Sequence, residues 1–188
     1  MRSVTKSKKK PQILLAVTGC IAAYKMPEFV RLLIKEEYSV KVILTELACQ
    51  FVTPVTLATV SQNTVYRDTF DTVDEWYPAH IFLAQWADLF VMAPLSADMI
   101  GKIAGGFADN LLLNTLLAYS GSVLMAPSMN DQMYANEIVK KNIEQLQDIS
   151  RYHFLDPDEG FLACLSEGSG RLPDLNVLVE KVKGLTYQ

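Results

Sequence analysis

The sequence has few of the residues from which metal and disulfide sites are built. It contains two histidines and three cysteines in 188 residues. No Cys-x-x-Cys pair occurs, and we therefore expect no metal site. The odd number and wide spacing of Cys20, Cys49 and Cys164 are typical of reduced thiols rather than of a disulfide framework. We therefore expect a cytoplasmic protein.

Long hydrophobic runs are also lacking. The apolar run at residues 13–17 is far shorter than the roughly 20 residues that span a membrane, and no other run approaches that length. The basic start of the chain is not followed by the apolar stretch of a secretory signal. These absences predict no membrane association.

The charge is unevenly distributed. The net charge is −4, but every charged residue among the first ten is basic. The rest of the chain contains 12 basic and 21 acidic residues. An acidic surface is repelled by a phosphate backbone, so nucleic acid is not an expected partner. Residues 1–11 are predicted to be a basic disordered arm, and residues 12–188 a single domain.

The hydrophobic pattern predicts an α/β fold. With 50% apolar and 20% charged residues, the composition excludes a disordered chain. Short apolar runs alternate with helical patterns, which is typical of a Rossmann-like (flavodoxin-like) open parallel sheet with helices on both faces. We expect Pro94 to end one strand and a polar, glycine-rich passage to follow it. Strands are predicted at 13–17, 40–44, 89–93 and 122–126, and helices at 21–36, 79–86, 108–119, 137–146 and 174–183.

Ligands of such sheets lie beyond the carboxyl ends of the strands. The segments to consider are therefore residues 18–20, 45–51, 94–99 and 127–133. Residues 18–20 precede a predicted helix, whose free N–H groups favour an anion, although a plain turn has the same pattern. The Gly-x-Gly-x-x-Gly and Gly-Lys-Ser motifs are absent, which disfavours the usual dinucleotide and P-loop sites. A second turn with a hydroxyl, at 93–99, favours a phosphorylated cofactor.

Three side chains are candidates for chemistry. His80 begins a predicted helix and suits either a general base or a surface capping residue. Asn130 follows a predicted strand and can bind a carboxylate, whereas Met129 beside it also suits core packing. Cys164 opens a glycine-containing segment that ends at Arg171. That segment fits a mobile loop closing on an anionic substrate, or an inert buried thiol. No Gly-x-Ser-x-Gly elbow occurs, which disfavours a serine hydrolase.

Five segments occur in the order found in a known family. They are residues 18–25, 80–81, 93–98, 127–134 and 164–171. Together they resemble the homo-oligomeric flavin-containing cysteine decarboxylases, over about residues 12–183. Within that family the chain is most similar to the members that act on phosphopantothenoylcysteine in coenzyme A biosynthesis.

The resemblance implies FMN bound at a subunit interface of a homo-oligomer, either a trimer or a dodecamer of paired trimers. It implies His80 as the base and Cys164 as the proton donor of the final reductive step. A separate phosphopantothenate-cysteine ligase is an implied partner, because many relatives are fused to one. Substrate binding is implied for Asn130, Met129 and Arg171. Flavin binding is implied for Gly19, Cys20, Thr45, Phe51, Ser96, Ala97, Asp98 and Met99.

The implied reaction is the FMN-dependent decarboxylation of 4′-phospho-N-pantothenoylcysteine to 4′-phosphopantetheine. A lantibiotic-type decarboxylase of peptidyl cysteine stops before reduction and needs no loop thiol, so Cys164 favours the coenzyme A reaction. A non-catalytic flavin-binding regulatory subunit is the third hypothesis, against which His80 and Asn130 also argue. The chain departs from the family pattern at Leu165, where glycine is frequent, at Asp98, where asparagine is frequent, and at Cys20, where serine or glycine is usual.

Overall fold

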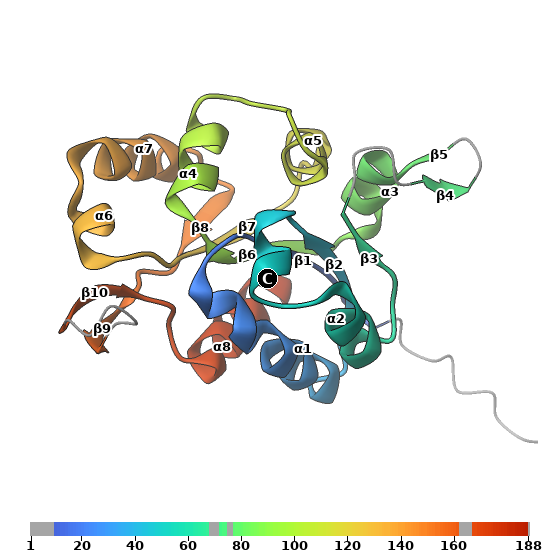
Figure 1. Cartoon of the computed structure of the whole chain (residues 1–188). Helices are drawn as coiled ribbons and strands as arrows, with labels where there is room; N and C mark the ends of the chain where they lie inside the picture. The colour runs from blue at the N-terminus through green and yellow to red at the C-terminus, as the bar shows by residue number, and fades with distance from the viewer. Residues whose placement is uncertain (1–9, 68–71, 75–76, 162–166, 188) are drawn as a thin grey trace, which may run out of the picture.

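The computed structural model describes residues 10–67, 72–74, 77–161 and 167–187. Most of the predicted basic arm, residues 1–9, lies outside this part. The described strands form a six-stranded sheet in which every neighbouring pair is parallel (Figure 1). In spatial order the strands are β3 (Val65–Tyr66), β2 (Ser39–Leu44), β1 (Gln12–Val17), β6 (Leu89–Leu95), β7 (Val123–Pro127) and β8 (Tyr152–Phe154).

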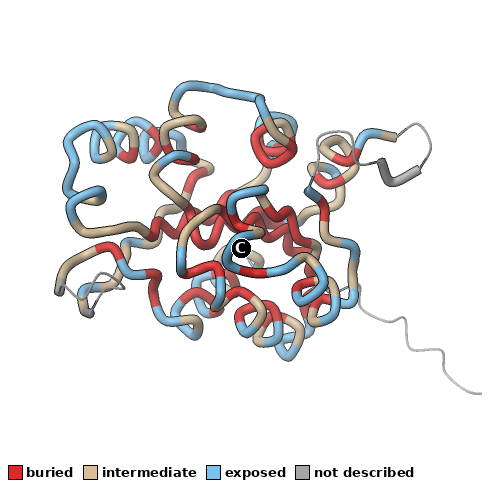
Figure 2. Tube along the Cα trace, in the orientation of Figure 1, coloured by how far each residue is buried: buried red, intermediate tan, exposed pale blue. Residues whose placement is uncertain are grey.

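Helices cover both faces of the sheet, as the sequence predicted. Every residue of β1 is buried, because Ile13 and Leu15 face one helical layer and Leu14 and Ala16 the other. Figure 2 shows the buried residues concentrated in the central strands. The first layer contains α1 (Met26–Lys35), α2 (Pro54–Ser61) and α8 (Leu175–Thr186). The second contains α3 (Ala79–Trp86), α4 (Ala97–Ala104), α5 (Leu111–Ala118) and α7 (Glu137–Gln147).

The topology places a ligand site at one point of the sheet. The chain builds β1, β2 and β3 outward on one side and then crosses to β6, β7 and β8 on the other. The order therefore reverses between β1 and β6. In open α/β sheets the carboxyl ends of the strands at such a switch point form the binding crevice. The predicted fold class is confirmed, and a ligand site is expected at the turns after β1 and β6.

The strand β6 corrects the prediction that Pro94 ends it. The strand continues to Leu95, and its pairing with β7 shifts register between Met92 and Leu95. One extra residue on β6 is a bulge, and a proline without an N–H is tolerated inside a sheet at such a point. The prediction failed because the sequence does not show where a bulge lies. At a bulge, the strand residue needs no backbone N–H to donate to the neighbouring strand.

The passage after Pro94 was predicted to be a turn and is a helix. In α4 the side chains of Met99, Ile100 and Ile103 share one buried face, which outweighs the low helix propensity of Gly101. The predicted helix at 21–36 is instead a 3-10 helix, η1 (Ile21–Lys25), followed by α1, with Pro27 in the first turn of α1.

Two short antiparallel hairpins complete the described chain. The pair β4 (Thr72–Asp74) and β5 (Tyr77–Pro78) precedes α3, and the pair β9 (Asp158–Phe161) and β10 (Glu167–Arg171) precedes α8. The segment 164–171 was interpreted as a loop, but its described part is strand β10. Among the described residues, no helix is long and apolar enough to cross a bilayer.

Candidate functional site

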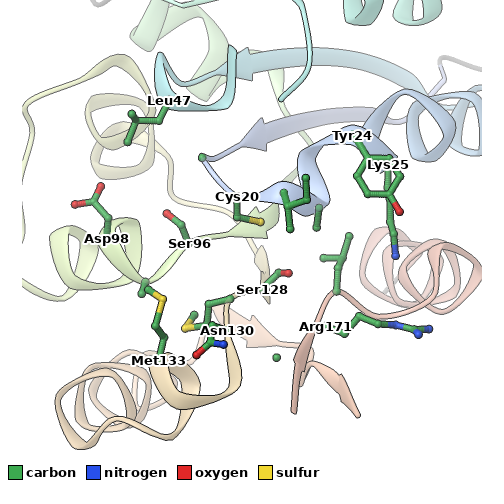
Figure 3. A pocket seen from close by; sticks show the side chains of 17 residues that line it. Cys20, Tyr24, Lys25, Leu47, Ser96, Asp98, Ser128, Asn130, Met133 and Arg171 are labelled. Carbon is green, nitrogen blue, oxygen red and sulfur yellow. The ribbon is translucent and has the colours of Figure 1, made fainter. Parts of the chain in front are cut away.

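A large cavity of the described structure lies at the switch point of the sheet. Its volume is about 610 Å³, within the range of small-molecule sites. Its walls come from the turns after β1, β6 and β7 and from the end of β10 (Figure 3). In this view Ser96 and Asp98 lie at one end, and Tyr24, Lys25 and Arg171 at the other. Segments far apart in the sequence therefore meet at one cavity, as the ordered motifs predicted.

Thr18 joins the turns after β1 and β6. Its hydroxyl donates to the Pro94 carbonyl at 2.7 Å and accepts from the Ser96 N–H at 2.8 Å. The Thr18 N–H also donates to the Pro94 carbonyl, at 3.3 Å. Because the side chain is 1% exposed, these bonds are shielded from water. They fix Gly19 and Ser96, the first residues of the cavity wall, relative to each other.

The next turn presents a helix N-terminus to the cavity. Ser96 is the N-cap of α4, and its hydroxyl accepts from the Met99 N–H at 3.4 Å. Ala97 and Asp98 follow in the first turn and also line the cavity. The free N–H groups and the positive end of the helix dipole favour an anion such as a phosphate. Ser96, Ala97 and Asp98, for which the resemblance implies flavin contacts, therefore lie at a helix end that favours an anion.

Cys20 lies in the cavity wall beside Ser128 (Figure 3). Burial raises the pKa of the Cys20 thiol above its ordinary value, and hydrogen bonds to Ser128 and to the backbone of Ala22 and Ala23 oppose that shift only in part. A thiol with a raised pKa is neutral at pH 7 and a poor nucleophile. The structure thus gives Cys20 a packing role in the wall rather than a covalent one.

The predicted substrate-binding residues also meet at this cavity. Met129, Asn130 and Arg171 all line it, and the Met129 N–H donates to the Gly170 carbonyl at 2.9 Å. Gly170 has a φ of +142°, and a Cβ at this position would collide with the Met129 carbonyl. Glycine is therefore required where β10 approaches the turn after β7. Asn130 is the N-cap of α6 (Asp131–Ala135), because its Oδ1 accepts from the Gln132 N–H at 2.9 Å.

The smaller cavity, of about 270 Å³, extends the same site. Gly19, Leu47, Ser96 and Asp98 line both cavities. Two further predicted flavin contacts, Thr45 and Met99, line the smaller one. There Lys102 Nζ lies 3.0 Å from Asp109 Oδ2 and 3.8 Å from Asp98 Oδ2. The hydrogen bond to Asp109 is the main cause of the raised pKa of Lys102.

Two described residues that were predicted for the site line neither cavity. Phe51 is 41% exposed and lines neither. His80 also lines neither, and its buried Nδ1 has no hydrogen-bond partner in the described structure. Cys164 and its neighbour Leu165 lie outside the described residues. Within those residues, no cluster of three or more His, Cys, Asp or Glu side chains suits a metal ion.

Sequence reasoning missed several residues that line the larger cavity. Tyr24, Lys25, Ser128 and Met133 lie inside the motif segments, so those segments contained the signal that finds them. Leu47 belongs to the turn after β2, which was a candidate segment as a whole. Leu172 is an ordinary apolar position that no motif marks.

The sheet is parallel, and its switch point has a helix end that favours an anion and a mainly apolar cavity. This arrangement is typical of proteins that bind a nucleotide-type cofactor. The chain belongs to the Flavoprotein family, whose profile matches residues 1–187. The family resemblance stated from the motifs is thereby confirmed.

Two relatives illustrate how much of a longer protein the chain represents. It is 44% identical over 168 residues to the coenzyme A biosynthesis bifunctional protein CoaBC of Bacillus subtilis (strain 168), covering 89% of this chain and 41% of that protein. It is 41% identical over 174 residues to a probable phosphopantothenoylcysteine decarboxylase of Streptococcus mutans, covering 92% and 97%. The chain thus spans about two fifths of the bifunctional relative and almost all of the second.

Solved structures confirm the fold. A cysteine-to-serine mutant of PPC decarboxylase complexed with pantothenoylaminoethenethiol superposes with a TM-score of 0.84 at 29% identity, covering 93% of this chain and 97% of that one. The FMN binding protein AtHal3 superposes with a TM-score of 0.81 at 30% identity, covering 93% and 96%.

Proposed function

We propose that the chain is an FMN-dependent decarboxylase that converts 4′-phospho-N-pantothenoylcysteine to 4′-phosphopantetheine in coenzyme A biosynthesis. One observation carries the proposal: a single cavity contains both an anion-favouring helix end at Ser96 and the predicted substrate residues Asn130 and Arg171. The relative from Streptococcus mutans, named as a probable decarboxylase of this kind, matches over almost its whole length.

The residues at the switch point fit FMN. Gly19 and Cys20 supply a close turn, Ser96 to Met99 supply helix N–H groups, and Thr45 supplies a hydroxyl. The apolar side chains of Leu47 and the neighbouring cavity wall suit the faces of an aromatic ring system. Bound there, FMN supplies the oxidation of the thiol end of cysteine, which lets the substrate accept the electrons left by departing CO₂.

The chain's own residues would bind the substrate and transfer the protons. Asn130 would hold the substrate carboxylate with its side-chain amide, with Met129 packing beside it, and Arg171 would attract the anionic end of the substrate. His80 would remove the proton that the oxidation releases. Cys164 would donate the proton that the final reduction requires.

The site is completed, we propose, by other copies of the chain. His80 and Phe51 lie outside both described cavities, whereas Ile21, Tyr24 and Leu47 at the larger one are each more than half exposed. Apolar side chains around an incomplete site are what a self-association surface requires. A trimer, or trimers paired into a dodecamer, would bring His80 of one copy to the flavin of another. Free thiols at Cys20 and Cys49 suit a cytoplasmic location.

The proposal is tested with the purified full chain reconstituted with FMN. A flavin spectrum, CO₂ release and a product with the mass of 4′-phosphopantetheine are expected, and the His80→Gln variant should lose most of the CO₂ release. Flavin-loaded protein that yields neither CO₂ nor product refutes the proposal. Enethiol formation from a peptide ending in cysteine would instead assign the peptidyl branch. Flavin binding without decarboxylation of either substrate would indicate a regulatory subunit.

A further inference from the structure

The ammonium group of Lys41 is enclosed by three aromatic rings. Lys41 Nζ lies 5.3 Å from the ring centroid of Trp86, 5.5 Å from that of Phe82 and 5.7 Å from that of Tyr66. All three distances are within the roughly 6 Å over which a cation is attracted to a ring face. We call these four side chains the Lys41 clamp. It joins three elements, because Lys41 is on β2, Tyr66 on β3, and both Phe82 and Trp86 on α3.

The rings are the groups that compensate the Lys41 charge. None of the ion pairs among the described residues includes Lys41. Burial lowers the pKa of Lys41, and no carboxylate among the described residues opposes that shift. A half-buried ammonium without a carboxylate partner is costly unless other groups stabilise it. The attraction to the rings therefore contributes directly to how α3 lies against the sheet.

Helix α3 is also held by the apolar core, because Phe82, Ala84 and Trp86 pack against the buried cluster that contains Ala79 and Leu83. It is eight residues long, and its N-cap, Pro78, makes no side-chain capping hydrogen bond. Ala79 and Leu83 are its buried residues, and Tyr77 of β5 donates to Gln85 Oε1 at 2.6 Å. A helix this short has little stability of its own. The Lys41 clamp therefore adds to the core packing as a contact that favours one rotation of α3 about its axis.

His80 lies on the same helix as the clamp rings. At 100° per residue, its side chain leaves the helix about 160° around the axis from Phe82 and about 120° from Trp86. A rotation of α3 toward or away from Lys41 would therefore turn the imidazole by the same angle. General bases tolerate little displacement, since about 1 Å can cost about 100-fold in rate.

We propose that Lys41 is a positioning residue that holds α3 in the rotation that orients His80. The proposal rests on the proposed function for its kinetic effect, but the orientation itself can be measured independently. In flavin-loaded enzyme, Lys41→Met should lower kcat about tenfold and leave KM nearly unchanged. Lys41→Arg should restore kcat, because a guanidinium also stacks on rings. The matched control Lys35→Met removes a charge from an exposed position of α1 and should change neither.

A double-mutant cycle separates positioning from a purely structural role. In the His80→Gln background, Lys41→Met should produce no further loss of kcat. The same tenfold loss in both backgrounds, or an unchanged kcat in the Lys41→Met single variant, overturns the proposal. Where Lys41→Met fails to fold, Phe82→Leu opens the clamp from the helix side and should give the same pattern.

A second readout does not depend on activity. The chain has two histidines, so a His153→Gln background leaves the NMR resonances of one imidazole. Lys41→Met should shift the His80 ring resonances, and Lys35→Met should not. Unshifted His80 resonances overturn the proposal that Lys41 positions α3, even if the enzyme is active. Shifted resonances in a protein without decarboxylase activity would refute the proposed function and leave the clamp standing.

Discussion

Gly19 is the residue whose enlargement should most directly weaken flavin binding. It lines both cavities at the turn after β1. A Cβ built at this position meets the Cβ of Leu47 at 2.5 Å, whereas ordinary contact begins at 3.4 Å. Gly19→Ala therefore requires Leu47 and its 3-10 helix η2 (Leu47–Gln50) to retreat by about 0.9 Å. That helix follows Thr45, so the retreat would alter the smaller cavity as well as the larger one.

The size of the effect follows from the cost of overpacking, which is typically about 1–3 kcal/mol. Leu47 is 62% exposed, so the helix can move outward and the fold should survive with a modest loss of stability. Flavin binding restores the displaced wall, so the penalty should appear in the FMN affinity. At about 1.4 kcal/mol per tenfold change, Gly19→Ala should raise the Kd for FMN by about 5- to 150-fold.

The assay is a titration of the flavin-free protein with FMN, followed by flavin fluorescence. Gly184→Ala is a matched control, since its Cβ on α8 meets nothing within 4 Å and the change should leave the Kd unaltered. Circular dichroism and the thermal midpoint establish that both variants are folded. If folded Gly19→Ala binds FMN as tightly as the wild type, the flavin does not lie against this turn, and the assignment of the cavity is wrong.

Three further predictions concern substrate, product and stability. Arg171→Leu should raise KM for the phosphorylated substrate by about 10- to 150-fold, because a charge-assisted hydrogen bond is lost, and should leave the flavin spectrum unchanged. An unchanged KM would contradict the assignment of Arg171 to substrate binding. Cys164→Ser should still release CO₂ but accumulate an unreduced product detectable by mass spectrometry, whereas normal product formation would contradict the role of proton donor. Burial raises the pKa of Tyr119 from 10.0 to about 12, and its hydroxyl donates to the Asp88 carbonyl at 3.0 Å. As the pH rises, the unfolded chain loses the Tyr119 proton before the folded chain does, so the free energy of unfolding should fall between pH 10 and about 12. Chemical denaturation should show a smaller fall in the Tyr119→Phe variant.

The fold was predictable because its central strands are apolar on both faces. Residues 13–17 and 89–93 have that pattern, and each proved to be buried in a parallel sheet. Helix α3 was predicted at about Ala79 to Trp86, which are its observed limits, and Pro78 is the extended residue directly before it. Helix α4 was missed because one glycine inside it and two directly after it suggested a turn, and the packing of Ile100 and Ile103 against the sheet is a tertiary effect.

The site was predictable where its residues are consecutive after a strand. Residues 18–20, 96–99 and 127–133 follow strands at the switch point, so topology alone brings them together. The location of His80 was not predictable, because the position of α3 depends on contacts with β2 and β3 that no local pattern encodes. A sequence motif identifies such a residue without showing which cavity it serves.

Two departures from the family pattern are compatible with the site because backbone groups and Thr18 build it. Cys20 follows a turn fixed by the Thr18 bonds to Pro94 and Ser96, none of which involves the Cys20 side chain. Asp98 adds a negative charge near an expected anion, but it lies in the first turn of α4, where the helix dipole favours a carboxylate. Lys102, four residues later, lies 3.8 Å from the same carboxylate and offsets its charge. The local field at the helix end therefore remains suited to an anion with aspartate in place of asparagine.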